Sequence, residues 1–278
     1  MLEVLKVILL GIVEGITEWL PISSTGHMIL LDEFVHLNVS EAFMEMFLVV
    51  IQLGAILAVV VLFWNQLWPF HRKNPKVQGL ASVVSPAKIT MWLKIAVSCL
   101  PAVVIGLPFD DFLEEHFYNY VVVAIMLIIY GILFILVENY RKGKRAEITK
   151  IPQITWKTAL LVGVFQVLAL IPGTSRSGAT ILGGLLLGMD RRTASRYTFF
   201  LAIPVMAGAS LLKLVKFGFH YTGLEVFYLL LGMAVAFLVS LFAIKFLMNY
   251  VKKHDFKAFG IYRIVLGIIV LAYFIIAH

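Results

Sequence analysis

Six apolar segments, each long enough or nearly long enough to cross a lipid bilayer as a helix, dominate this chain of 278 residues. Only 14% of the residues are charged and 61% are hydrophobic, whereas soluble domains carry about a quarter charged residues. A soluble fold would need a polar shell that this sequence cannot supply, so lipid must serve as its solvent. The segments are Phe43–Trp64, Met91–Pro108, Tyr120–Val137, Ser195–Lys216, Leu224–Met248 and Phe259–Ala277.

Two further apolar stretches, Met1–Leu31 and Thr155–Gly188, are each interrupted near the middle by proline, glycine, serine and a charged residue. Such stretches predict helix–break–helix hairpins rather than straight spans. Irregular backbone is tolerated at membrane depth only where protein or a wet cavity surrounds it. We therefore predict that both hairpins are re-entrant, entering the membrane and leaving by the same face.

The charges of the loops predict the orientation. Segments 71–90 and 139–157 hold ten Lys and Arg residues and one acid, Glu147, and segments 190–196 and 249–257 are also basic. Segments 32–45 and 109–118 hold acids and no Lys or Arg. The positive-inside rule places the basic loops in the cytoplasm and the acidic ones outside. The adjacent acids Asp110 and Asp111 are expected to form a solvated turn.

Six alternating spans satisfy these assignments if the first hairpin enters from outside and the second from the cytoplasm, as an inverted repeat requires. We predict an all-α polytopic membrane protein, one membrane domain over 1–278, with repeat halves 1–138 and 155–278 joined by a basic cytoplasmic loop, 139–154. A shift of 152 positions aligns Gly11 with Gly163, Glu14 with Gln166, Ser23 with Ser175, and Gly26 with Gly178.

The first motif is Glu-Gly-Ile-Thr-Glu-Trp-Leu-Pro-Ile-Ser-Ser-Thr-Gly-His, residues 14–27. A helix places Glu14 and Glu18 on one face, where two charges about 6 Å apart repel by ~3 kcal/mol at an effective dielectric of about 20. A bound cation, a nearby arginine or a retained proton must compensate. The alternative is an interfacial helix with both carboxylates in water. We expect Pro21 to end the helix.

Hydroxyl groups and a histidine follow Pro21. Capping of a second helix could explain one of the three hydroxyls. It does not explain all three together with a glycine and a histidine. A hydroxyl, a nearby histidine and an upstream carboxylate are the components of an activated nucleophile, although a lone histidine on an apolar face is more often structural. The candidates are Ser23, Ser24, Thr25, Gly26 and His27.

The second motif, residues 171–180, reads Ile-Pro-Gly-Thr-Ser-Arg-Ser-Gly-Ala-Thr. Glycines allow close backbone approach, hydroxyls donate hydrogen bonds, the next helix directs its positive end to the break, and Arg176 offers a fork for phosphate oxygens. These features predict an anion-binding cradle that meets the first motif near the membrane midplane. Alternatively, Arg176 only neutralises Glu14 or Glu18. The cradle residues are Gly173, Thr174, Ser175, Arg176, Ser177 and Thr180.

Both motifs closely resemble the signature motifs of bacterial undecaprenyl-diphosphate phosphatases, the bacitracin-resistance family, and the resemblance covers essentially the whole chain. It implies a metal-dependent hydrolase that removes the terminal phosphate of undecaprenyl diphosphate and so recycles the carrier lipid for cell-wall synthesis. It also implies an inverted-repeat fold with re-entrant hairpins in the bacterial plasma membrane and a site reached from the outer side. The implied catalytic set is Glu14, Glu18, Ser24, His27 and Arg176.

On this basis we expect Arg176 and the cradle to hold the diphosphate, while Mg²⁺ or Ca²⁺ bridges it to Glu14 and Glu18. Ser24 would attack phosphorus with His27 managing its proton, although His27 as nucleophile or as activator of water fits equally well. The expected partners are a prenyl diphosphate lipid and membrane lipids, with no nucleic acid, and a homodimer stays open.

The main competing interpretation is an inverted-repeat transporter or flippase for an anionic, phosphate-bearing substrate. A serine, a histidine and glutamates beside an anion cradle exceed what binding alone requires. An unrelated lipid phosphatase family with a histidine nucleophile needs a further histidine downstream of its arginine, and none occurs between Arg176 and His220. Membrane proteolysis by a serine–histidine pair leaves the glutamates and the arginine without a role.

Overall fold

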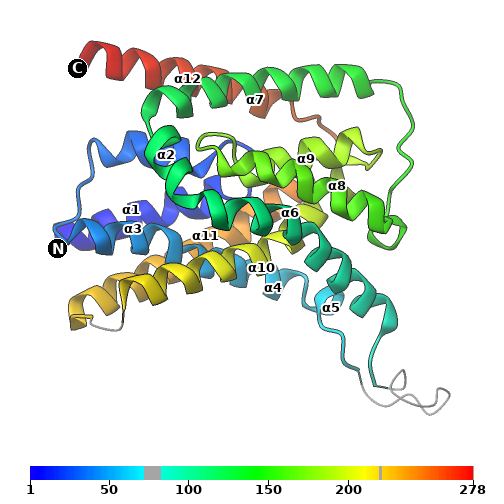
Figure 1. Ribbon diagram of the computed structural model, residues 1–278, viewed down its shortest axis with the longest axis horizontal. Coiled ribbons are helices and arrows are strands. Elements are labelled where there is room, and N and C mark those ends of the chain that lie inside the picture. Colours follow the sequence, from blue (N-terminus) through cyan, green and yellow to red (C-terminus); the bar gives the residue numbers. More distant parts are fainter. Residues whose placement is uncertain (72–82, 219–220, 278) are drawn as a thin grey trace.

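The computed structural model describes residues 1–71, 83–218 and 221–277, and within these ranges the protein is built from helices, with no β-strand beyond two isolated bridges (Figure 1). Side chains at positions 32, 110, 111, 114 and 277 are not described. The elements are α1 (Leu2–Thr17), α2 (Ser24–Asp32), α3 (Glu41–Val50), α4 (Gln52–Leu62), α5 (Trp64–Leu67), α6 (Pro86–Phe117), α7 (Tyr120–Arg141), η2 (Ile151–Gln153), α8 (Trp156–Val167), η3 (Leu168–Leu170), α9 (Arg176–Leu186), α10 (Arg191–Phe217), α11 (Gly223–Tyr250) and α12 (Lys257–Ala277).

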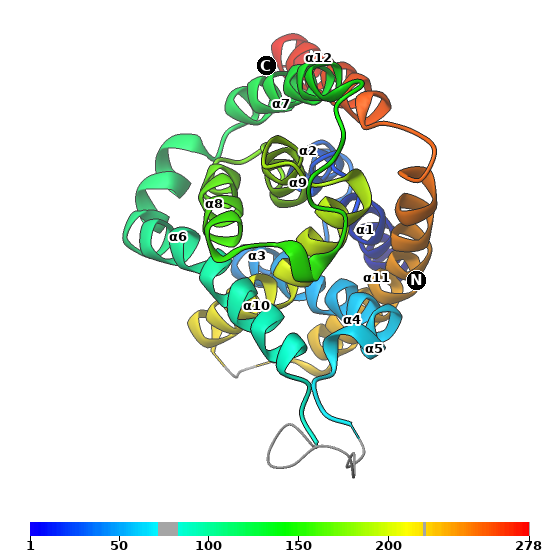
Figure 2. The same cartoon turned by 90° about the vertical axis from the view of Figure 1, so that its right-hand side faces the viewer.

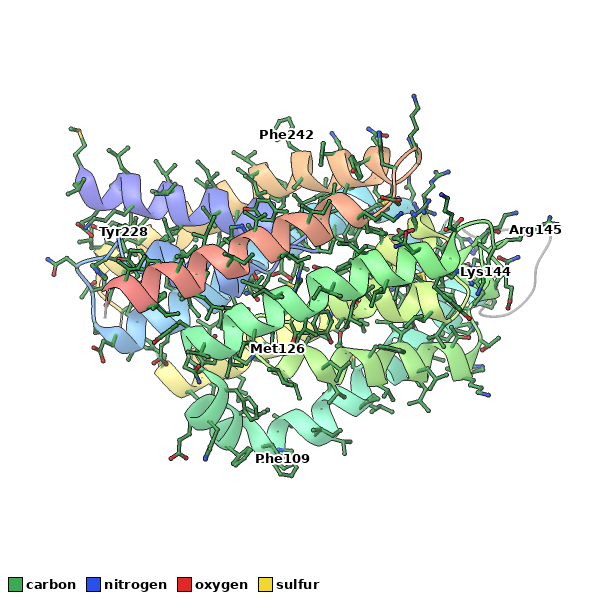
Figure 3. All side chains as sticks on the ribbon, turned by 90° about the horizontal axis from the view of Figure 1, so that it is seen from above. Phe109, Met126, Lys144, Arg145, Tyr228 and Phe242 are labelled. Atoms are coloured by element: carbon green, nitrogen blue, oxygen red, sulfur yellow. The ribbon has the colours of Figure 1, made fainter. Side chains whose placement is uncertain are left out.

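The six predicted spans are confirmed as helices long and apolar enough to cross a membrane: α3 with α4, α6, α7, α10, α11 and α12. Their outward faces carry large apolar side chains, such as Phe109 at 52% exposure and Phe242 at 74% (Figure 3). A soluble protein would not present such a surface to water, because contiguous exposed apolar area drives association. The surface therefore agrees with a lipid environment.

Two of the spans differ from the sequence prediction. The first span is two helices that meet at Ile51, and α6 continues beyond Pro108 to Phe117. The expected acidic loop 109–118, with its solvated turn at 110 and 111, is thus largely helical, because prolines within α6 do not end it. In the basic loop before the second span, residues 72–82 lie outside the described part of the chain.

Both interrupted stretches contain two helices with a break between them. Helix α1 ends at Thr17, four residues before the predicted stop at Pro21, and the chain turns until α2 begins at Ser24. In the second stretch, α8 and the short η3 precede a break over 171–175, and α9 follows. The helix–break–helix pattern is therefore present in both stretches.

The short helices α2 and α9 lie toward the middle of the bundle, and longer helices surround them (Figure 2). Helices α7 and α12 pack side by side as the outer layer next to them (Figures 1 and 2). They approach closely because Gly131 and Gly260 face each other: a Cβ on either would lie 2.6 Å from the carbonyl oxygen of the other. This tight pair encloses the two breaks from one side.

Candidate active site

The two breaks meet in the interior, as the sequence predicts. Arg176, the first residue of α9, donates from Nη2 to Oε1 of Glu18 at 2.9 Å. Ser177 Oγ donates to the backbone carbonyl of Glu18 at 3.1 Å. The side chains of Glu18 and Arg176 are 8% and 11% exposed, so their attraction is only weakly screened by solvent. Two motifs that are far apart in the sequence therefore form one site.

Glu18 is the centre of this site, because each of its carboxylate oxygens accepts a different donor. Oε1 accepts from Arg176, and Oε2 accepts from Ser24 Oγ at 3.1 Å. Arg176 also donates from Nη1 to the carbonyl oxygen of Thr198, 3.0 Å away, which fixes the plane of the guanidinium. The expected pairing of the arginine with a glutamate is thus present, and it brings the cation beside the Ser24 hydroxyl.

Glu14 lies one helical turn before Glu18, and the Glu18 N–H donates to its backbone carbonyl at 3.0 Å. The Glu14 side chain is buried, and its Oε1 has no hydrogen-bond partner among the described residues. Burying a carboxylate oxygen without a donor is costly, so this atom is suited to a cation or a proton. With Ser24, Thr25 and Gln52, Glu14 lines a cavity of about 540 Å³ to which α1, α2, α3, α4, α7 and α12 contribute side chains.

Ser23 and Ser175 hold matching positions at the starts of α2 and α9. Each has a positive φ, 72° and 70°, and each accepts a hydrogen bond from the N–H of the glycine three residues later, Gly26 or Gly178. A left-handed conformation is costly for a residue with a Cβ. The two serines therefore act as strained helix caps, which confirms capping for one hydroxyl in each motif.

The other predicted phosphate-binding residues have different places. Thr180 Oγ1 donates to the Arg176 carbonyl oxygen at 2.8 Å, so it stabilises the backbone of Arg176 at the start of α9. Thr25 lines the cavity, and the buried Thr174 Oγ1 has no partner within the described chain. Gly173 has φ +88°, and a Cβ there would lie 2.5 Å from the Val123 carbonyl, so only glycine fits. Thr180 thus braces the first turn of α9, which carries Arg176, and binding of phosphate by the second motif stays a prediction.

His27 is turned toward a residue that the motifs do not include. Its Nδ1 is 2.7 Å from the Ser23 carbonyl oxygen, and its Nε2 is 2.6 Å from the hydroxyl of Tyr262 on α12. Within the described chain its hydrogen bonds are these two, and Ser24 pairs with Glu18 instead. The expected Ser24–His27 contact is therefore absent from this conformation, and the hydroxyl's immediate proton acceptor is a carboxylate.

Arg263, the residue after Tyr262, joins the two breaks. Its side chain is fully buried; Nη1 donates to the Pro21 carbonyl at 3.3 Å, and Nη2 donates to the carbonyls of Gly173 and Thr174 at 2.7 and 2.9 Å. Neither Tyr262 nor Arg263 belongs to the two motifs from which the site was predicted. An arginine in the middle of an apolar span was the available signal, because ionisable groups at membrane depth are costly and functional.

Comparison with known proteins places the chain in a family. The family model described as bacitracin resistance protein BacA matches residues 7–269, nearly the whole chain. The chain belongs to the BacA family. Among its relatives, undecaprenyl-diphosphatase from Enterococcus faecalis is 62% identical over 97% of this chain and 96% of its own length. Undecaprenyl-diphosphatase from Desulfitobacterium hafniense is 64% identical, over 99% and 97% of the two chains.

In this BacA-family chain, Tyr262→Phe removes the hydroxyl that contacts His27 Nε2. The variant retains the aromatic ring, whose centroid is 5.6 Å from that of the stacked imidazole. We expect a roughly tenfold lower kcat with little change in KM, since one hydrogen bond to an ionisable group is worth about 1.5 kcal/mol or more. Tyr273→Phe, also on α12, is the matched control. Equal kcat for Tyr262→Phe and the wild type would show that Tyr262 does not position His27 for the reaction.

Proposed function

We propose that this protein hydrolyses undecaprenyl diphosphate to undecaprenyl phosphate and inorganic phosphate, recycling the carrier lipid for peptidoglycan synthesis and conferring bacitracin resistance. The observation that carries the proposal is the shared carboxylate of Glu18, which joins the Ser24 hydroxyl to the Arg176 guanidinium. Relatives more than 60% identical over nearly their full length carry the name undecaprenyl-diphosphatase. A nucleophile beside an arginine fork suits phosphoryl transfer, which depends mainly on positioning and charge neutralisation.

In the mechanism we propose, Arg176 exchanges its bond to Glu18 for oxygens of the terminal phosphate. Ser24 Oγ attacks the terminal phosphorus, its proton passes to Glu18 Oε2, and the bond from that phosphorus to the bridging oxygen breaks. Undecaprenyl phosphate leaves, and water then cleaves the phosphoserine to release inorganic phosphate and restore Ser24. His27, held by Ser23 and Tyr262, is the second proton carrier; His27 as the nucleophile is the alternative that the next experiment tests.

The fate of the phosphoryl group distinguishes these alternatives. We expect Ser24→Ala to lower kcat by roughly 10³-fold or more, because loss of a nucleophile removes the covalent route. Rapid quenching of the wild type with labelled substrate in denaturing detergent at neutral pH, where phosphoserine and phosphohistidine both survive, should leave labelled phosphate on Ser24. Thr25→Ala, at the neighbouring hydroxyl, is the control and should retain the label. Label on His27 in place of Ser24 contradicts the assignment.

A divalent cation, Mg²⁺ or Ca²⁺, fits the acidic part of the site. Glu14 offers an unpartnered buried oxygen, and hard cations prefer carboxylate oxygens. Glu18 accepts one hydrogen bond on each oxygen, and because a carboxylate has about four lone-pair sites it could also contribute an oxygen to the cation. The described residues contain no group of three or more His, Cys, Asp or Glu side chains placed for a metal. A bound cation would therefore also use substrate and water oxygens, and it would neutralise charge on the diphosphate.

The cavity of about 540 Å³ is the proposed path of the prenyl chain. Glu14 and Ser24 line it together with apolar side chains that include Met28, Leu48 and Phe274. A ligand site that combines an apolar lining with few polar groups suits an amphiphile whose reactive end is charged. The rest of a long prenyl chain would lie outside in the lipid.

We further propose that the two hairpins are re-entrant and that the chain is an inverted repeat. Ser23 and Ser175, 152 positions apart, share the same strained cap. Helix α1 packs against α11 as α8 packs against α6, and α7 pairs with α12. The α1–α11 pair of one arrangement thus corresponds to the α8–α6 pair of the other, and the α7–α12 pair corresponds to itself, if the two halves are related by a repeat. Cysteine accessibility on the two sides of a sealed vesicle, at Glu33 and at Thr158, tests the opposite entry of the hairpins.

The charge of the loops favours the bacterial plasma membrane with the basic end in the cytoplasm, so the cavity beside Glu33 and Tyr118 would open to the outer side. Lys144 and Arg145 lie at one end of the molecule and Tyr228 at the other (Figure 3). Substrate would then enter from the outer leaflet. A homodimer remains a prediction, which the mass of the protein in detergent would decide.

Phosphate release from a long-chain prenyl diphosphate, measured on the purified protein in detergent, tests the function directly. We expect release that stops with chelator and returns with added Mg²⁺ or Ca²⁺. A transporter or flippase would bind the lipid without cleaving it. Lipid binding with no phosphate release in any divalent cation contradicts the hydrolase, whereas release that survives chelation contradicts only the cation.

A further inference from the structure

A second charged pocket shares no lining residue with the cavity beside Glu14 and Ser24; it lies between α4, the start of α10 and the end of α11 and has a volume of about 260 Å³. Four cationic side chains line it: Arg192, Arg196, Lys245 and Lys252. It lies at the basic end of the molecule, since the preceding residue Arg191 pairs with Glu138 near the end of α7. None of these groups has a part in the proposed reaction.

The cations of this pocket have no carboxylate at ion-pair distance among the described residues, although the nearby Asp190 attracts Arg196. Within the described chain, Arg196 Nε is buried without a hydrogen-bond partner. The nearest acid on α10, Asp190, accepts the Thr193 N–H at 2.6 Å as the helix cap. Gathering four positive charges costs free energy through repulsion, so the pocket is suited to an anion.

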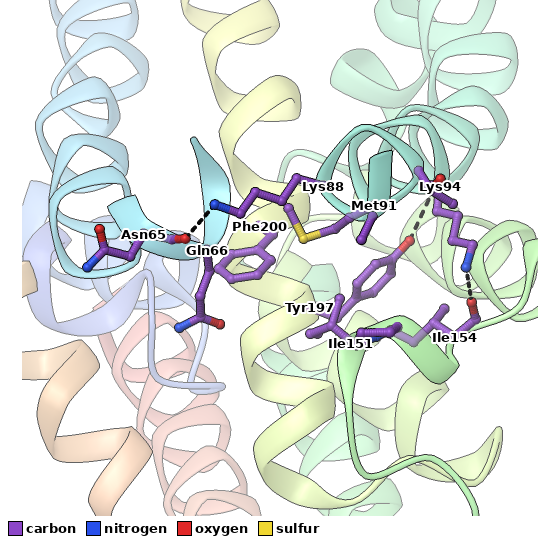
Figure 4. A pocket seen from close by; sticks show the side chains of 12 residues that line it. Asn65, Gln66, Lys88, Met91, Lys94, Ile151, Ile154, Tyr197 and Phe200 are labelled. Atoms are coloured by element: carbon purple, nitrogen blue, oxygen red, sulfur yellow. Dashed lines mark hydrogen bonds between the residues drawn. The ribbon is translucent and has the colours of Figure 1, made fainter. Parts of the chain in front are cut away.

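The lysines of another cavity, of about 430 Å³, differ from these cations because backbone carbonyls accept their hydrogen bonds. This cavity also contains two cations, but Lys88 donates to the Asn65 carbonyl at 2.8 Å and Lys94 donates to the Ile154 carbonyl at 2.5 Å (Figure 4). Those ammonium groups serve the packing of α6 against its neighbours. In the four-cation pocket Lys252 donates to Asn249 Oδ1 at 2.7 Å, so the donors that a ligand would use are those of Arg192, Arg196 and Lys245.

The surface beside the pocket indicates where the anion comes from. Leu238 and Phe242, 55% and 74% exposed, precede Lys245 on α11 by seven and three residues, spacings that place all three on one face of the helix. An apolar strip therefore runs along the helix into the cationic pocket. Trp64 and Trp68 follow the pocket residues Leu62 and Phe63 along the chain, and their ring centroids are 4.6 Å apart. Tryptophans are enriched where a membrane meets water. Acyl chains fit the strip, and a phosphate fits the pocket.

We propose that this pocket binds the phosphate of an anionic phospholipid of the inner leaflet, whose acyl chains lie along Leu238 and Phe242. The assignment to the inner leaflet rests on the orientation proposed above, but the assignment of the binding site does not. Free phosphate lacks the apolar part that the strip would contact. Basic pockets between spanning helices at the cytoplasmic side are recognised sites for anionic head groups. Binding there would hold α10, which carries Thr198 against Arg176, to α4 and α11.

The test uses the full-length protein, delipidated in detergent, and measures the rise in its thermal unfolding midpoint against added phosphatidylglycerol. Parallel titrations contain phosphatidylcholine or inorganic phosphate. We expect phosphatidylglycerol to bind most tightly, and Arg196→Gln and Lys245→Gln each to weaken it by about fivefold, which is the effect of one basic group near a lipid surface. Lys144→Gln and Arg145→Gln, in an exposed loop, are the charge-matched controls and should leave the affinity unchanged.

Several outcomes would overturn the proposal. They are equal binding of the two phospholipids, inorganic phosphate binding as tightly as phosphatidylglycerol, and equal losses in the pocket and control variants. Lys245 is exposed, so its variant should fold even if Arg196→Gln does not. Phosphate release from prenyl diphosphate by Lys245→Gln should match the wild type. Loss of lipid binding together with intact hydrolysis therefore separates this site from the proposed active site.

Discussion

Replacement of Arg176 by alanine is expected to lower kcat for prenyl diphosphate hydrolysis by roughly 10³-fold, because an arginine that stabilises a transferring phosphoryl group supplies that order of rate enhancement. Arg176→Lys keeps the charge but loses the fork, and it should recover only part of the rate. Phosphate release under saturating substrate, with the thermal midpoint as a check of folding, measures both variants. Arg145→Ala, in an exposed loop, is the matched control.

A double variant separates the two roles of Arg176. If the arginine only neutralises Glu18, then Arg176→Met combined with Glu18→Gln should be no slower than Glu18→Gln alone, since a neutral pair replaces an ion pair. We expect the double variant to be much slower than Glu18→Gln, because the phosphate also loses its donor. Equal rates would favour the neutralising role and remove Arg176 from the reaction.

Replacement of Arg263 by methionine is expected to damage both the fold and the activity. The substitution leaves the carbonyls of Pro21, Gly173 and Thr174 buried without their donor, and each such group costs about 1–3 kcal/mol. The two breaks should then shift relative to each other, and a displacement near 1 Å lowers the rate by roughly 100-fold. The thermal midpoint in detergent and kcat should both fall.

Arg263→Lys should restore part of the midpoint, because an ammonium can still reach one or two of the three carbonyls. Lys253→Met, which removes an exposed cation just before α12, is the control and should resemble the wild type. Wild-type midpoint and kcat in Arg263→Met would mean that packing of α7 and α12 alone holds the breaks together. The two readouts also distinguish Arg263 from Arg176, whose loss should affect kcat far more than the midpoint.

The helix boundaries show how far sequence patterns reach. Apolar length located the six spans, because the hydrophobic requirement of a membrane is one-dimensional and is read directly along the chain. Pro21 predicted the end of α1, whereas the helix ends at Thr17 and a turn follows. The acidic residues after Pro108 predicted a loop, although α6 continues through this segment. Proline restricts the backbone, but packing decides whether a helix ends.

The sequence by itself determined the lipid environment, the two interruptions and the kinds of group that they carry, because composition and local order require no knowledge of neighbours. Tertiary structure alone decided that Glu18 accepts both Ser24 and Arg176, that His27 turns to Tyr262, and that Arg263 joins the breaks. Arg176 is 158 positions from Glu18 and Tyr262 is 235 from His27. Contacts across such separations depend on the rotation and depth of each helix, which are set by packing against the others.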